Sequence, residues 1–156
     1  MNKTLNLLFV TVAFLMASCA KSDLSRDGHE GKIEFTVQSG LKTYVDVAAA
    51  GVATGSQRMY SFVGTKAPSS ENMFGLSFQT DSLRPGTYNV SSGVITFREG
   101  SQIFTSVNNL QFTVTITSNN GGLVNGTFSG TLYDHTTLNS CSVVNGSIQN
   151  IQLSYR

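Results

Sequence analysis

One stretch, residues 107–133, limits most strongly what this chain can fold into. Apolar and polar residues alternate from Leu110 to Thr117, which is the period of two of a half-buried β-strand. Residues 118–122 (SNNGG) then supply the Asn and Gly that tolerate positive φ in a hairpin turn. The alternation resumes after the turn, so the stretch predicts an antiparallel hairpin with one face in a core. The expected inward residues are Leu110, Phe112, Val114, Ile116, Val124, Phe128 and Leu132.

Two glycines, Gly126 and Gly130, fall on the inward phase of the returning strand. A glycine at such a position leaves space that a facing aromatic ring can fill, or it marks a β-bulge. The chain contains 10 Phe and 5 Tyr, so we expect aromatic filling.

Short alternating segments recur along the rest of the chain, divided by Gly, Ser and Asn turns. No useful length of sequence shows the i, i+3, i+4, i+7 apolar stripe of a helix. The pattern predicts an all-β fold over residues 32–156: a single antiparallel β-sandwich, jelly-roll or immunoglobulin-like, with about eight to ten strands. Expected strands are 32–37, 41–49, 58–63, 74–78, 88–90, 94–97, 102–105 and 141–156, the last being a strand pair or one bulged strand. Residues 66–72 and 134–140 are expected loops, and 48–55 a loop or a closely packed edge.

Residues 1–19 have the pattern of an N-terminal export signal. Lys3 gives a positive start, and the apolar run over 5–17 is shorter than the roughly 20 residues that span a bilayer. Met16-Ala17-Ser18 directly precede Cys19 and are similar to a lipobox, although Met16 stands where the pattern prefers Leu. The resemblance implies a signal helix over 1–18, acylation of Cys19, a flexible tether over 19–31 and anchoring to the outer membrane. The periplasmic and surface leaflets both stay open, and ordinary secretion with cleavage after Ala20 is the alternative.

Cysteine usage bears on the same question. The chain has two cysteines, Cys19 and Cys141. If Cys19 carries the lipid, Cys141 has no partner and is expected to be a small buried hydrophobe. The alternative is a disulfide between the two, as the even count of an exported protein would suggest.

Charge excludes one class of partner. Only 12% of residues are charged, with 10 Lys and Arg against 9 Asp and Glu, so loss of Lys3 with the leader leaves a formally neutral chain. Nucleic-acid binding needs a basic patch that is missing here. Attachment to the membrane is therefore expected through acyl chains and not through a polybasic surface.

A family resemblance covers residues 83–155. It is carried by Pro85-Gly86-Thr87-Tyr88, the 112–117 strand, the GTFSG of 126–130 and the VNGSIQNI of 144–151. These segments resemble small uncharacterised lipoproteins from Bacteroidetes-type bacteria, a domain-of-unknown-function family. The resemblance implies an exported, lipid-anchored β-sandwich with no catalytic residue to carry over.

Candidate catalytic groups are few. Asp134-His135 could orient an imidazole, but a metal needs three or four ligands, so we expect a solvated loop pair and no metal or cofactor. We expect no enzyme; the one exception considered is a hydrolase in which Cys141 is the nucleophile and His135 its base.

Candidate binding residues are aromatic. Tyr44, Tyr60 and Tyr88 lie near expected strand or turn edges and could stack on a sugar, although they could equally pack in the core with the hydroxyl at its rim. Asp81-Ser82-Leu83 resembles a bacterial O-glycosylation acceptor, which would require an exposed loop over 79–83 and a glycan on Ser82.

The sequence thus predicts a lipid-anchored cell-envelope protein with a non-catalytic structural or binding role. A glycan- or small-ligand-binding module is the first alternative and a small envelope hydrolase is the second. A closed barrel around a lipophilic ligand is a third, which would need an apolar cavity of a few hundred cubic ångströms.

Overall fold

The computed structural model describes residues 31–66, 69–90, 94–106, 112–134, 136–137 and 139–155. The predictions for the signal peptide, Cys19, all but the last residue of the tether, Leu110 and His135 lie outside these residues. The described part of the chain contains eleven strands, against the eight to ten expected. They are β1 (Lys32–Val37), β2 (Gly40–Tyr44), β3 (Asp46–Thr54), β4 (Gln57–Lys66), β5 (Ser69–Thr80), β6 (Gly86–Asn89), β7 (Val94–Glu99), β8 (Gln102–Thr105), β9 (Thr113–Asn120), β10 (Leu123–Asp134) and β11 (Ser140–Tyr155).

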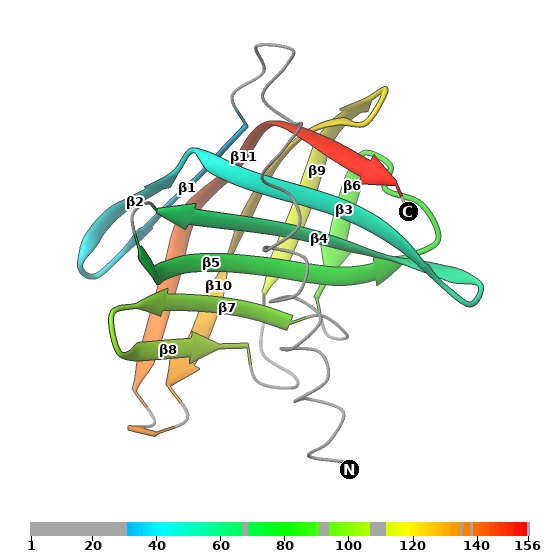
Figure 1. The fold of residues 1–156 in the computed structure, drawn as a ribbon. Coiled ribbons are helices and arrows are strands. Elements are labelled where there is room, and N and C mark those ends of the chain that lie inside the picture. The colour runs from blue at the N-terminus through cyan, green and yellow to red at the C-terminus, as the bar shows by residue number, and fades with distance from the viewer. Residues whose placement is uncertain are drawn as a thin grey trace.

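The strands form two layers (Figure 1). Pairing runs β2-β1-β11-β10-β9-β6 in what we call the rear sheet, and β3-β4-β5-β7-β8 in the front sheet. The two sheets join where the end of β11 pairs with β3 and the end of β10 pairs with β8. Every pair is antiparallel except β11 with β3. The predicted antiparallel β-sandwich is therefore confirmed.

The hairpin that dominates the sequence is β9 and β10. Its turn is Gly121-Gly122, with φ of 61° and 90°, and a two-residue turn of this kind needs positive φ at both positions. The turn is shorter than the expected 118–122 segment, because Ser118 to Asn120 belong to β9 and pair with β10. All of the expected inward residues that the structure describes are buried, namely Phe112, Val114, Ile116, Val124, Phe128 and Leu132.

Phenylalanine rings fill the space between the sheets. Phe74 of the front sheet lies 4.7 Å from Phe35 and 5.0 Å from Phe128, both on the rear sheet, measured between ring centroids. Phe97 makes an edge contact with Phe35 at 5.4 Å. Such pairs add to the free energy of area burial. Protein side chains thus occupy the central space that a lipophilic ligand would need.

The glycines of β10 are explained by the backbone and not by a ring. The register shifts beside Gly126 and beside Gly130, which marks bulges. A Cβ on Gly126 would lie 2.6 Å from the Thr115 carbonyl oxygen, so the expected aromatic filling is wrong there. The ring instead faces Gly146 on β11, where a Cβ would collide with Phe128.

Several boundaries differ from the expectation. The prediction of a loop over 66–72 is wrong from Ser69 onward, because β5 begins at Ser69, which pairs with Lys66. Residues 48–55 belong almost wholly to β3, whose small side chains make room for tyrosines: a Cβ on Gly51 would lie 3.1 Å from the Tyr60 ring. The last segment is one bulged strand, with positive φ at Asn145 (53°) and Asn150 (51°).

Candidate binding face on the rear sheet

The three candidate tyrosines do not form an exposed platform. Tyr44 and Tyr60 are each 3% exposed and belong to the core. Burial, followed by the nearby Glu99 carboxylate, raises the pKa of Tyr44. Tyr88 is half-buried, and its hydroxyl donates to the Arg84 carbonyl at 2.6 Å and accepts from the Arg84 N–H at 2.9 Å. Tyr44 and Tyr60 therefore pack in the core, which was the alternative to sugar stacking, and their rings cannot stack on a surface ligand.

The predicted glycosylation segment is exposed only in part. Asp81 is exposed and Ser82 is intermediate, but Leu83 is buried in the core. Residues 79 and 80 are the end of β5. Modification of Ser82 stays a prediction.

Cys141 is a free thiol and is buried, as expected for a small hydrophobe. Burial raises the pKa of this thiol, and the Glu99 carboxylate raises it further. Since the thiolate is the nucleophile, these surroundings disfavour the reactive form.

Asp134 is not the solvated loop residue that the sequence suggested. It is 6% exposed and accepts hydrogen bonds from the Thr136 N–H at 2.7 Å and the Thr137 hydroxyl at 2.9 Å. The Thr136 N–H and the Thr137 hydroxyl hold the pKa of this carboxyl below its usual range. Its role in the described residues is to fix the turn between β10 and β11.

The described residues contain neither a metal-binding cluster nor a membrane-spanning helix. They hold no group of three or more His, Cys, Asp or Glu side chains that could bind a metal ion. Within the same ranges, no helix has the length and apolar character needed to cross a membrane.

The outward face of the rear sheet carries a regular polar array. One residue from each of its six strands lies directly opposite the next in register, and cross-strand partners point to the same face. Neighbouring strands lie about 4.8 Å apart, so the side chains form an evenly spaced line across the sheet. We call this line the hydroxyl row: Thr43 (β2), Glu34 (β1), Ser147 (β11), Thr127 (β10), Thr115 (β9) and Thr87 (β6).

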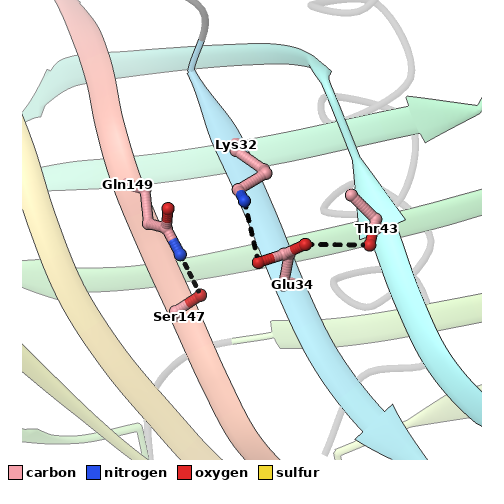
Figure 2. Close-up of polar contacts among 5 residues, drawn as sticks. All are labelled: Lys32, Glu34, Thr43, Ser147 and Gln149. Atoms are coloured by element: carbon pink, nitrogen blue, oxygen red, sulfur yellow. Dashed lines mark hydrogen bonds and ion pairs between the residues drawn. The ribbon is translucent and has the colours of Figure 1, made fainter.

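The carboxylate in the row is compensated. Figure 2 shows Glu34 between Lys32, whose Nζ lies 3.0 Å from Oε2, and Thr43, whose hydroxyl donates to Oε1 at 3.0 Å. The Lys32 ammonium first, and then the Thr43 hydroxyl, hold the pKa of Glu34 below its usual range. On β11 the Gln149 amide donates to the Ser147 hydroxyl at 3.0 Å. This end of the row is therefore ordered and formally neutral.

The other end of the row is open. The Thr87 and Thr115 hydroxyls share a hydrogen bond of 3.0 Å. Thr127 is exposed, and its hydroxyl makes no hydrogen bond to the residues that the structure describes. A hydroxyl has one donor and two acceptor sites, so most of the hydrogen-bonding capacity of these three residues remains for a ligand.

Charge is almost absent from this part of the molecule. Strands β6, β9, β10 and β11 together contain one charged residue, Asp134, and it is buried. Further hydroxyls flank the row on the same face, where Ser129 pairs with Thr113 and Thr131 with Ser142. The result is a neutral surface of donors and acceptors.

The sequence pattern predicted which side of the sheet these threonines face, but it did not indicate that they form a binding surface. The alternation already put the threonines of 113–117 and 127–131 on the outward phase. The density of hydroxyls on that phase was the available signal. Strand order was the missing information, because nothing local aligns Glu34 or Thr87 with Thr115.

The resemblance of residues 83–155 to the small lipoprotein family stays a prediction. Comparisons with known proteins found no matching family model, no matching curated protein and no matching solved structure.

Proposed function

We propose that this protein is a lipid-anchored cell-envelope protein with a non-catalytic binding role, and that the outward face of its rear sheet is the binding surface. The observation that carries the proposal is the hydroxyl row: six adjacent strands present hydrogen-bonding side chains in register. Any sheet aligns its outward side chains; the specific feature here is that every member of the row has a side chain that can form hydrogen bonds.

The anchor in this proposal rests on the sequence. Met16-Ala17-Ser18 before Cys19 supports acylation, and the neutral chain offers no electrostatic route to a membrane. A domain held by acyl chains can leave one broad face free for a ligand.

The anchor is tested by fractionation. Cells expressing the wild-type chain or Cys19→Ser are fed a radiolabelled fatty acid and separated into membrane and soluble fractions. We expect the wild-type protein to be labelled and in the membrane fraction, and Cys19→Ser to lack the label. A wild-type chain without label would overturn the anchor.

The binding face is tested with the purified full chain in detergent, by co-sedimentation with envelope fragments of the source bacterium. Thr127→Glu places a charge in the middle of the hydroxyl row, and Thr96→Glu places the same charge on the outward side of the front sheet. We expect at least a tenfold loss of co-sedimentation for Thr127→Glu and none for Thr96→Glu. Equal binding by both variants would show that the rear face is not the binding surface.

A further inference from the structure

We infer that the ligand of this face is a neutral, unbranched glycan chain that lies across the strands of the rear sheet, along the hydroxyl row. This inference rests on the proposed function and adds the chemical class and the direction of the ligand.

Charge complementarity gives the class. An anionic ligand would need unpaired Lys or Arg, but the strands of the rear sheet contain no Arg and two lysines, and each lysine is in an ion pair: Lys32 with Glu34 at 3.0 Å, and Lys42 with Glu99. A cationic ligand would need free carboxylates, and the one acidic residue on β6, β9, β10 and β11 is the buried Asp134. A neutral polymer rich in hydroxyls matches a neutral face because each sugar hydroxyl can both donate and accept.

Spacing gives the direction. The row advances by one strand, about 4.8 Å, per side chain, which is comparable to the length of one monosaccharide in an extended glycan. Six strands have five intervals and therefore span roughly 24 Å. A chain of about five or six monosaccharides, on the same spacing, would meet one side chain per sugar.

The exposed apolar side chains fit the same ligand. Leu41 on β2 and Val144 on β11 are 67% and 43% exposed, and both lie opposite Thr36 in the row next to the hydroxyl row. A pyranose ring has C–H groups on its faces that can rest on such side chains. The two residues thus provide an apolar border where an aromatic platform is lacking.

The twist of the sheet favours a single glycan chain as the ligand, and not the flat surface of a crystalline polysaccharide. Adjacent strands rotate by about 20–25°, so five steps from β2 to β6 sum to roughly 100–125°. A flat crystalline surface could touch two or three strands at once, whereas a single flexible chain can follow the whole row.

The inference is tested by native affinity electrophoresis of the full chain in detergent micelles through gels that contain one soluble polysaccharide each. Neutral probes are dextran, yeast mannan and hydroxyethylcellulose; anionic probes are alginate and heparin. We expect retardation by at least one neutral probe, unchanged between low and high salt because no ion pair forms. Thr127→Glu should weaken that retardation at least tenfold, and Thr96→Glu should leave it unchanged. Oligosaccharides of increasing length should compete better up to about six sugars.

Three results would overturn the inference. They are retardation by anionic probes alone, equal retardation of Thr127→Glu and wild type, and no retardation by any neutral probe. Two results would contradict the glycan ligand but keep the rear sheet as the binding surface. In the first, Thr127→Glu loses envelope binding although no neutral probe retards the wild-type protein. In the second, protease treatment of the envelopes abolishes binding. Thermal unfolding midpoints of the variants show whether each one is folded.

Discussion

One outward row of each sheet shows a difference between the two sheets, although their inward faces are alike. A row across the front sheet pairs Ala48, Val63, Gly75 and Thr96, which are mostly small and apolar. The corresponding row across the rear sheet is made of hydroxyls and one paired carboxylate. Both sheets contribute Phe, Leu and Ile to one core. Packing therefore explains what the two sheets share, but it does not explain the difference between these two outward rows.

The largest effect should come from the core that both faces share. Phe74 is fully buried and contacts rings of the opposite sheet at 4.7 and 5.0 Å. Phe74→Ala should lower the free energy of unfolding by about 3–5 kcal/mol, measured by chemical denaturation. Phe74→Leu should cost clearly less because it retains much of the volume. Equal losses for the two variants would mean that the ring contacts do not join the sheets.

Two glycines, one on each sheet, should respond differently to substitution by alanine. A Cβ on Gly146 would collide with the Phe128 ring and backbone, whereas a Cβ on Gly75 meets nothing within 4 Å. Gly146→Ala should destabilise by about 1–3 kcal/mol through overpacking. Gly75→Ala should be neutral or stabilise by about 0.5–1 kcal/mol because a strand glycine loses more backbone entropy on folding. Thermal unfolding checks both; a stable Gly146→Ala would contradict the close approach.

Acid should weaken an ion pair that joins the two sheets. Glu99 at the end of β7 forms an ion pair with Lys42 of β2, and Ser39 donates to it at 3.0 Å. The Lys42 ammonium first, with the Ser39 hydroxyl, holds the pKa of Glu99 below its ordinary 4.5. A lowered folded-state pKa stabilises above the unfolded value and is lost as the pH falls through the folded value. The free energy of unfolding should therefore decrease as the pH falls below about 4.5.

Two amide variants assign that pH dependence. Glu99→Gln should lower stability at neutral pH by about 1 kcal/mol or less, since the pair is partly exposed, and should flatten the acid limb of the profile. Glu34→Gln should flatten it too, because the Lys32 ammonium and Thr43 hydroxyl also lower the pKa of Glu34. Denaturation at a series of pH values checks this. If the loss of stability at acid pH is unchanged in Glu99→Gln, the ion pair between Lys42 and Glu99 is not its cause.

The smallest effect on stability should accompany a clear effect on binding. Thr115→Val keeps the shape of the side chain and removes the hydroxyl that bonds Thr87 at 3.0 Å. As a surface change it should alter the free energy of unfolding by no more than about 0.5 kcal/mol, while envelope binding falls several-fold. Thr96→Val on the front sheet is the control and should change neither. A loss of binding in the control would erase the contrast between the faces.

The fold was predictable where local pattern decides it. Alternation assigned the inward residues of β9 and β10, and the Gly121-Gly122 turn followed from the need for positive φ. It failed at Ser69, where a strand of polar residues pairs with β4 and carries no apolar alternation. Val144 is 43% exposed because the bulge at Asn145 and Gly146 changes the phase of the last strand, and a simple alternation could not have predicted this.

The candidate site was predictable only in its parts. Sequence periodicity determined that Thr115 and Thr127 face away from the core, since a period of two assigns each residue to a side. It could not determine that Tyr44 and Tyr60 turn inward, because glycines on other strands make the room for them. Only the tertiary structure decided that β11 lies between β1 and β10 and that β6 lies beside β9. Strand pairing depends on contacts between distant segments, and those contacts align scattered hydroxyls into one row.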